Sequence, residues 1–392
     1  MKILQLTTAY FPSATHGGPV VSIHCLNKAL IREGVEVFVI TTNSGLSQKE
    51  KKRSLIWHDV EGVKVKYFPY YFHENFKFSP QLFFELLSTI SDYDLVHINS
   101  IWDFNMLAGA LSCKMSNIPY IVSPRGSLDD NAFNVSSKFV KVFYYKLCLK
   151  QFIKHANAIH FATNDEIKNV TSFVELPDER IVVPNGFDLT ELQNLPNKGE
   201  FKNKYNLDGK RYILFLGRIH KQKGINFLLE AFKKIRNVIP NLYLVIAGFE
   251  QKRYMKEIQK WINENGLPNK IIFTGLITGK EKLAAYIDAD VFVLSSYFES
   301  FGMTVVEAIG CGVPIIISDR VGIKDDVLKY NAGIVTSLNS SQIAEAILSI
   351  LNSQTLAAKL SQNGYKLLEE KYDIKKVGIK MLEAYKKICR IN

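Results

Sequence analysis

The 392-residue chain is 47% hydrophobic and has a formal net charge of +11, and its length exceeds what one hydrophobic core usually supports, so we expect two domains. No apolar run approaches the roughly 20 residues that span a bilayer, and the five scattered cysteines form no CxxC pair, which argues against a membrane-spanning helix, a disulfide framework and a zinc site. A reducing, cytoplasmic location fits this composition, and the positive charge suits a phosphate-bearing ligand or an anionic membrane face, since no nucleic-acid-binding motif stands out.

Strand-like and helix-like segments alternate along the first half of the chain. Short apolar runs predict buried strands, and apolar residues that recur every three or four positions predict helices. The predicted strands are 3–7, 36–41, 63–68, 95–98, 120–122, 158–161 and 181–183, and the predicted helices are 20–33, 80–90, 104–115 and 138–154. This alternation indicates a parallel sheet with helices on both faces.

A polar segment at 187–210 is predicted to be a linker, and a second alternation follows it. Its predicted strands are 212–216, 242–247, 271–274, 291–294 and 314–318, and its predicted helices are 224–236, 251–264, 280–287 and 303–309. We therefore expect an α/β chain of two facing, doubly wound Rossmann-like domains, at 1–190 and 191–374, with an amphipathic helix at 375–391 within a terminal segment 375–392. Ligands of such sheets bind outside the carboxyl ends of the strands, here in the cleft between the domains.

Two glutamates eight positions apart are the most informative feature of the second half. Glu299 is expected in a loop after the strand 291–294, and Glu307 about one turn into the helix 303–309. Between them, the N-terminus of this helix offers unpaired N–H groups to an oxygen-rich ligand. One carboxylate at each end can accept hydrogen bonds from a different set of hydroxyls, an arrangement that suits a sugar attached to a nucleotide.

Cations and glycines are placed where a diphosphate could bind. Arg218 and Lys223 lie between the strand 212–216 and the helix that follows it, and a guanidinium and an ammonium beside a helix N-terminus suit a diphosphate. The pair Gly17-Gly18 precedes the first helix, where the backbone can approach a ligand closely. The acidic pairs at 92–94 and 288–290 precede strands rather than follow them, so we predict no metal site.

The segment 138–154 alternates lysines with aromatic and aliphatic residues. A basic, aromatic helix can lie on an anionic lipid leaflet. An ordinary helix with its apolar face in the core and its lysines in solvent has the same pattern, and the sequence leaves both alternatives open.

Taken together, these segments resemble the retaining GT-B glycosyltransferases of the large glycosyltransferase family 4, which includes sugar transferases for lipopolysaccharide, capsule and exopolysaccharide. The resemblance runs nearly from end to end, through Gly17-Gly18, 96–102, 123–128, 183–188, Gly217-Arg218 with Lys223-Gly224, and 299–302 with Glu307-Ala308. The last two blocks are the specific ones.

The resemblance implies that Arg218 and Lys223 hold the donor diphosphate, that Glu299 contacts hydroxyls of the donor sugar and that Glu307 binds the ribose hydroxyls. The other donor-binding residues are then expected to be Gly17, Gly18, Asn185, Phe301, Gly302 and Met303, the last three through backbone N–H groups. Many relatives have a histidine near the reacting carbon where this chain has Arg125. Arg125 or His97 could take that catalytic role, and the terminal helix would return to the first domain.

The expected reaction moves a sugar from a nucleoside-diphosphate sugar to a hydroxyl of a glycan or lipid-linked acceptor, with anomeric retention, in surface polysaccharide biosynthesis. The resemblance implies no cofactor and no metal, and we expect no nucleic-acid partner. Segment 138–154 would contact the inner face of the cytoplasmic membrane. The alternatives are a nucleotide-sugar epimerase or a phosphorylase of the same fold, and a binding subunit that has lost turnover.

Overall fold

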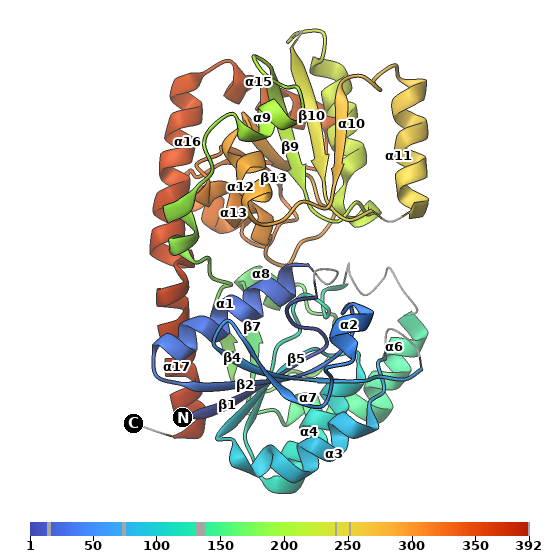
Figure 1. Cartoon of the computed structure of the whole chain (residues 1–392), viewed down its shortest axis with the longest axis vertical. Helices are drawn as coiled ribbons and strands as arrows, with labels where there is room; N and C mark the ends of the chain where they lie inside the picture. The colour runs from blue at the N-terminus through green and yellow to red at the C-terminus, as the bar shows by residue number, and fades with distance from the viewer. Residues whose placement is uncertain (14–16, 73–75, 131–137, 240, 251, 391–392) are drawn as a thin grey trace. The chain divides into compact units, whose positions relative to one another are not determined.

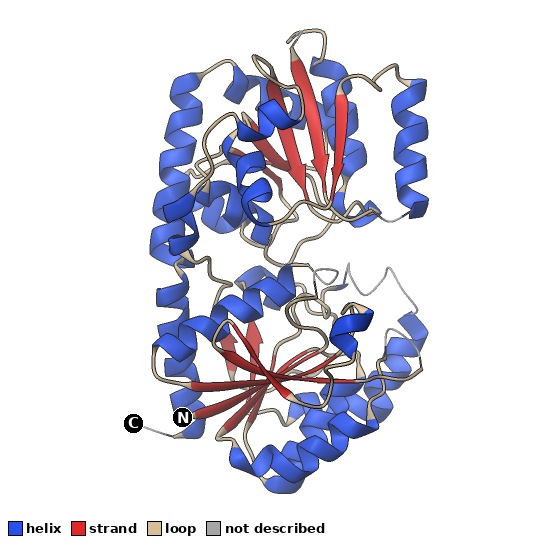
Figure 2. Cartoon of the chain, viewed as in Figure 1, coloured by secondary structure: helices blue, strands red, loops and turns tan. Residues whose placement is uncertain are grey.

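The computed structural model describes residues 1–392 except 14–16, 73–75, 131–137, 240, 251 and 391–392. Contacts between residues divide the chain into two compact units, Met1–Gly186 with Ile374–Asn392, and Phe187–Asp373. Each unit is a sheet with helices packed against it (Figures 1 and 2). Among the described residues, we find no helix whose length and apolar character would let it span a bilayer.

The first unit is built on an eight-stranded sheet, as far as the chain is described, in the order β3-β4-β2-β1-β5-β6-β7-β8. Its strands are β1 (Lys2–Thr7), β2 (Glu36–Thr42), β3 (Trp57–Val60), β4 (Val63–Phe68), β5 (Leu95–Asn99), β6 (Tyr120–Val122), β7 (Ala158–Phe161) and β8 (Arg180–Val182). Neighbouring strands are parallel except β3, which pairs antiparallel with β4. Parallel pairing places the carboxyl ends of β1, β5 and β6 at one edge of the sheet.

The helices of the first unit cover this sheet. They are α1 (Gly18–Arg32), α2 (Gln48–Lys51), α3 (Pro80–Thr89), η2 (Ile90–Asp92), α4 (Phe104–Ser116), α6 (Lys138–Tyr144), η3 (Tyr145–Leu149), α7 (Lys150–Lys154), α8 (Asn164–Lys168) and α17 (Ile374–Cys389). The last of these, α17, lies close to α1: a Cβ added at Gly378 would come within 2.8 Å of the Cβ of Ala29. Val377, Met381 and Tyr385 of α17 are buried in the same apolar cluster as Leu26 of α1.

The second unit has a parallel sheet in the order β11-β10-β9-β12-β13-β14 among its described residues. Its strands are β9 (Arg211–Leu216), β10 (Leu242–Ala247), β11 (Ile271–Gly275), β12 (Val291–Leu294), β13 (Ile315–Ser318) and β14 (Ile334–Thr336). Its helices are η4 (Leu189–Asn194), α9 (Glu200–Lys204), η5 (Lys221–Lys223), α10 (Ile225–Ile235), α11 (Lys252–Glu264), α12 (Gly279–Ile287), α13 (Met303–Gly310), α14 (Lys324–Tyr330), α15 (Ser340–Leu351), α16 (Gln354–Leu367) and η6 (Leu368–Tyr372). The predicted fold class, two doubly wound α/β domains, is confirmed.

The predicted linker at 187–210 is wrong. This segment folds as η4 and α9 and belongs to the second unit. Phe187, Phe201 and Leu207 are buried among its polar neighbours, and Asp288 accepts the backbone N–H of Phe201 at 3.0 Å. These buried side chains and the hydrogen-bonded start of α9 hold both ends of the segment in the second unit, so it is not a linker, although no side chain between 189 and 200 is buried.

The segment 138–154 is helical, but not as one regular α-helix. A π-helical turn, η3, interrupts it at Tyr145–Leu149 between α6 and α7. Tyr145, Leu149 and Ile153 are buried, whereas Phe139 is 91% exposed. The segment therefore has one apolar face in the core and a second apolar face in solvent.

Candidate functional site

Arg218 and Lys223 lie at the carboxyl edge of the second sheet, where β9 ends and η5 leads into α10. The Nζ of Lys223 pairs with the carboxylate of Glu299, which follows the adjacent strand β12. Both side chains are mostly shielded from solvent. Two residues far apart in the sequence and both predicted for the site are therefore in direct contact.

At least three contacts hold the loop of Lys223 against the loop of Glu299. The Oγ of Ser295 donates to the carbonyl of Gly224 at 2.8 Å, and the N–H of Tyr297 donates to the carbonyl of Gln222 at 2.8 Å. The third contact is the ion pair of Lys223 itself. Gly224 has a φ of +61°, and a Cβ on it would lie 1.8 Å from the carbonyl oxygen of Ser295, so only glycine permits this close approach.

The electrostatic environment of this loop is cationic. Arg218 is exposed, and Lys223 packs beside the strand end, its Cε 3.9 Å from a Cβ placed on Gly217. Burial lowers the pKa of His220, and the charges of Arg218 and Lys223 lower it further. Both cations therefore lie close enough to lower the pKa of His220, and such a concentration of positive charge is what a diphosphate site needs.

Glu307 lies in α13 and is held by two residues of α12. Its carboxylate accepts from the Nζ of Lys282 at 2.9 Å and from the hydroxyl of Tyr286 at 3.0 Å. Burial raises the pKa of Tyr286 well above its ordinary value, and the charge of Glu307 adds to this. Burial alone would lower the pKa of Lys282, but the charge and the hydrogen bond of Glu307 outweigh it and raise that pKa. Both partners therefore keep their protons and fix the carboxylate.

The N-terminus of α13 lies between the two glutamates. Its cap is Gly302, at a φ of +95°, and the first N–H groups of a helix have no intrahelical acceptor. Phe301 is buried, with its ring edge against Tyr372 at a centroid distance of 5.3 Å. The side chain of Phe301 thus anchors the segment from Phe301 to Met303, and the backbone of this segment forms the start of α13.

In the first unit, the structure brings Arg125 and Asn185 together. The guanidinium of Arg125 donates from Nη1 to the Oδ1 of Asn185 at 2.8 Å and from Nη2 to the Oδ1 of Asn99 at 2.7 Å. Gly17 is the exposed cap of α1 at a φ of +63°, and Gly18 begins the helix. Asn99 ends β5, Arg125 follows β6 and Asn185 follows β8, while Gly17 and Gly18 lie where α1 begins.

His97 is fully buried in the middle of β5. Its Nδ1 lies 2.7 Å from the hydroxyl of Tyr385 on α17, and its ring contacts that of His160. Burial, together with the neighbouring His160 and the positive charge of Arg125, lowers the pKa of His97 well below its ordinary value. A neutral imidazole inside the core ties α17 to the sheet, and its position argues against contact with a substrate.

Sequence reasoning missed Lys282 and Tyr286, which hold Glu307, and Asn99, which holds Arg125. No motif marks them. Lys282 and Tyr286 are four positions apart on a predicted helix and so share one face, which is the signal that could have indicated them. Asn99 directly follows the predicted strand 95–98, and ligand-binding groups gather at the carboxyl ends of such strands.

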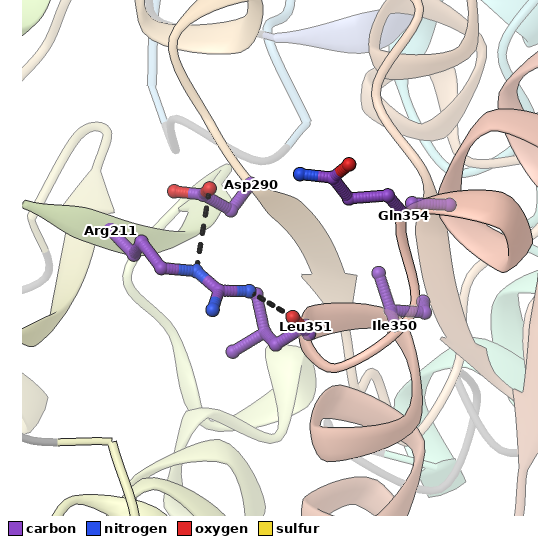
Figure 3. A pocket seen from close by; sticks show the side chains of 6 residues that line it. Arg211, Asp290, Ile350, Leu351 and Gln354 are labelled. Carbon is purple, nitrogen blue, oxygen red and sulfur yellow. Dashed lines mark hydrogen bonds and ion pairs between the residues drawn. The ribbon is translucent and has the colours of Figure 1, made fainter.

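A cavity of about 340 Å³ lies elsewhere in the second unit. Figure 3 shows Arg211 between Asp290 and the main chain of Leu351, with Ile350 and Gln354 beside them. Arg211 begins β9 and Asp290 precedes β12, so this cavity is at the amino edge of the sheet, opposite Lys223 and Glu299. Asp290 accepts the N–H of Tyr212 at 2.8 Å, which is a structural role.

Two family models match adjoining parts of the chain. The model described as "Glycosyltransferase Family 4" matches residues 16–191, and the model described as "Glycosyl transferases group 1" matches residues 197–367. The first match covers most of the first unit, and the second contains Arg218, Lys223, Glu299 and Glu307.

Relatives of full length are also found. An uncharacterized glycosyltransferase of Methanocaldococcus jannaschii, MJ1607, is 27% identical over 98% of this chain and 98% of its own length. The alpha-monoglucosyldiacylglycerol synthase of Streptococcus pneumoniae is 24% identical over 95% of this chain and 82% of its own length. Among solved structures, Anabaena Alr3699/HepE in complex with UDP and glucose has a TM-score of 0.81 at 18% identity, over 99% of this chain and 100% of that chain. WaaG, a glycosyltransferase involved in lipopolysaccharide biosynthesis, has a TM-score of 0.72 at 15% identity, over 98% and 99% of the two chains.

Proposed function

Since the chain belongs to glycosyltransferase family 4 and is a glycosyltransferase of the group 1 type, we propose that it moves a sugar from a nucleoside-diphosphate sugar to an acceptor hydroxyl with retention of the anomeric configuration. The observation that supports this best is the contact of Lys223 with Glu299 beside Arg218. A group for the phosphates and a group for the sugar hydroxyls are then adjacent, as a donor with a sugar on its terminal phosphate requires.

The proposed mechanism depends on charge. As the glycosidic bond breaks, negative charge grows on the leaving diphosphate, and groups that bind it more tightly in the transition state accelerate the step. Arg218 and Lys223 supply this stabilisation, together with the first N–H groups of α13. We propose that these cations, rather than a metal ion or a cofactor, balance the leaving group. Glu299 orients the donor sugar, and Glu307 binds the ribose hydroxyls.

A donor screen followed by two assays tests this function. Thermal shift with uridine, guanosine and adenosine diphosphate sugars selects the donor, and turnover is then measured without an acceptor and with a lipid-linked acceptor mixture. A glycosyltransferase needs the acceptor for rapid turnover and forms a glycoside that keeps the donor's anomeric configuration. An epimerase releases an epimeric sugar without an acceptor, a phosphorylase consumes inorganic phosphate, and a binding subunit stabilises the donor without turnover.

Glu307→Gln is expected to weaken the binding of the nucleoside diphosphate about tenfold or more, because hydrogen bonds to a charged group contribute about 1.5–3 kcal/mol. The amide keeps the size of the side chain and can still accept from Lys282, so the fold should be retained. Calorimetric titration of the nucleoside diphosphate measures the effect. Glu281→Gln is the control, because Glu281 lies next to Lys282 on α12 but pairs with Lys204. Equal affinity of the wild type and the Glu307 variant would show that the ribose assignment is wrong.

We further propose that the acceptor is lipid-linked and that the enzyme works at the inner face of the cytoplasmic membrane, in surface polysaccharide synthesis. Two similar proteins support this choice of acceptor: the alpha-monoglucosyldiacylglycerol synthase, and WaaG, a glycosyltransferase involved in lipopolysaccharide biosynthesis. The solvent-facing side of 138–154 supports the location. Phe139, Phe143 and Leu147 are 91%, 68% and 67% exposed, and Phe139 and Phe143 share one face of α6 because they are four residues apart.

Charge on this segment suits an anionic lipid surface. Lys146 is exposed beside the apolar face. Lys150 and Lys154 are already paired with Glu175, at 2.5 and 3.2 Å, which reduces their attraction to lipid. The exposed aromatic residues should therefore contribute more to membrane binding than these two lysines, because burying one phenylalanine contributes about 1.5–3 kcal/mol.

The double variant Phe139→Ser/Phe143→Ser is expected to bind vesicles of phosphatidylglycerol at least tenfold more weakly than the wild type in a sedimentation assay. Lys150→Gln/Lys154→Gln should weaken binding by a smaller factor. Leu328→Ser, which removes an apolar residue 55% exposed in the second unit, is the matched control and should change nothing. Unchanged binding of the phenylalanine variant would leave 138–154 as an ordinary core-facing helix.

A further inference from the structure

Arg125 is held in one orientation by two asparagines. Its Nε and Nη2 donate to the Oδ1 of Asn99 at 3.2 and 2.7 Å, and its Nη1 donates to the Oδ1 of Asn185 at 2.8 Å. Asn99 is itself fixed, since its amide nitrogen donates to the Oε1 of Gln5 at 2.8 Å. The guanidinium therefore cannot turn without breaking several hydrogen bonds at the carboxyl edge of the first sheet.

The backbone at Arg125 is also constrained. Its φ is +53° and that of Gly126 is +80°, and a non-glycine residue in this left-handed region costs about 1–2 kcal/mol. The buried carboxylate of Glu166 holds the turn, because it accepts the N–H of Gly126 at 2.6 Å and the N–H of Ala162 at 2.8 Å. Strain that the surrounding contacts maintain in this way is typical of functional positions.

The charge of Arg125 lacks a carboxylate in contact. Within the described part of the chain, both oxygens that accept from its guanidinium belong to neutral amides, and Glu166 uses its oxygens on backbone N–H groups. Desolvation lowers the pKa of Arg125 to about 10, although the charge of the nearby Glu166 opposes this lowering, so the guanidinium is still a cation at neutral pH. A desolvated cation whose hydrogen-bond acceptors are all neutral amides is complementary to an anion.

The guanidinium retains donors for such an anion. Arginine has five N–H groups, and three hydrogen bonds to Asn99 and Asn185 occupy three of them. The side chain is half-buried rather than enclosed, so a ligand can reach it. We propose that Arg125, positioned by Asn99, Asn185 and Glu166, binds a phosphate oxyanion of a substrate.

This inference rests on the proposed glycosyl transfer for the identity of the ligand, and two substrates of that reaction have the required chemistry. One is the diphosphate of the donor, and the other is the phosphate that joins a sugar to a lipid-linked acceptor. Both present oxyanions that match the planar fork of a guanidinium. Pyrophosphate binding and kinetics distinguish these two sources from each other, and from an arginine that only joins Asn99 to Asn185 and binds no ligand.

Binding of pyrophosphate gives a test that does not depend on turnover. In the Lys223→Ala background, Arg125→Gln and Asn185→Asp are each expected to weaken pyrophosphate binding at least tenfold by calorimetry. Asn185→Asp keeps the side-chain shape and adds an ion pair to Arg125, so its melting temperature should not fall, and it remains usable if Arg125→Gln fails to fold. Arg180→Gln, at the amino end of β8, is the matched control. If both double variants bind pyrophosphate as tightly as the Lys223→Ala variant alone, the proposal is overturned.

Kinetics then identify the source of the phosphate. If it belongs to the donor, Arg125→Gln in the otherwise wild-type chain raises the Kd of the nucleoside diphosphate about tenfold. If it belongs to the acceptor, that Kd is unchanged, and the KM of a polyprenyl-diphosphate-linked acceptor rises about tenfold while that of a phosphate-free alkyl glycoside does not. If Arg125→Gln changes neither the Kd of the nucleoside diphosphate nor the KM of the polyprenyl-diphosphate-linked acceptor relative to the wild type, the proposal is contradicted. Absence of transfer by the wild type with every donor contradicts the proposed function instead and leaves the pyrophosphate result to stand by itself.

Discussion

Lys223→Ala is expected to reduce kcat/KM for the nucleotide sugar on the order of a hundredfold, and by no less than about tenfold. The fold should be retained. The loss of one group that stabilises developing charge typically costs about 2.7–4 kcal/mol, and Lys223 is the cation held directly against Glu299. Since the stabilisation grows as the diphosphate leaves, kcat should fall more than the affinity for the intact donor. Initial rates over a range of donor concentrations measure both.

Lys221→Ala is the matched control for this prediction. Lys221 lies on the same short helix η5, but it is 65% exposed and pairs with Glu257 at 3.0 Å. Its removal changes the net charge by the same amount and should leave kcat/KM close to the wild-type value. Comparable losses for both lysines would indicate a general effect of charge, and full activity of the Lys223 variant would contradict its diphosphate role.

Apolar patterning was sufficient to predict most strands of the two sheets, but β3 and β14 were not among the predicted strands. Strand β3, Trp57–Val60, was missed because it is an edge strand whose residues are exposed or half-buried, so it has no apolar run. The segment 187–210 was misassigned for a similar reason. Its many polar residues outnumber Phe201 and Leu207, although these two are buried and determine where the segment packs.

Candidate site residues could be named from the sequence where one short motif contains them, as for Lys223 and for Glu299 with Glu307, and their roles stay predictions. Contacts between distant segments could not. His97 ends up in the core because Tyr385, 288 positions later in the chain, donates to or accepts from its ring. Nothing local to β5 reveals that partner, so the sequence alone could not decide whether His97 faces a ligand or the core.

Gly224→Ala is expected to destabilise the protein by about 3 kcal/mol or more and to abolish most of the activity. The added Cβ would lie 1.8 Å from the carbonyl oxygen of Ser295, so the backbone must move, which typically costs about 1–3 kcal/mol. The left-handed φ of +61° adds about 1–2 kcal/mol for alanine. The movement separates the loop of Lys223 from the loop of Glu299, and thermal unfolding together with donor turnover measures both consequences.

Gly266→Ala distinguishes steric conflict from backbone strain. Gly266 has nearly the same φ, +64°, but a Cβ added to it would meet no described atom within 4 Å, so alanine there should cost only the strain of about 1–2 kcal/mol and leave kcat unchanged. A Gly224 variant as stable and as active as the Gly266 variant would mean that the two loops tolerate separation. The contact of Gly224 with Ser295 would then have no part in bringing the cation and the carboxylate together.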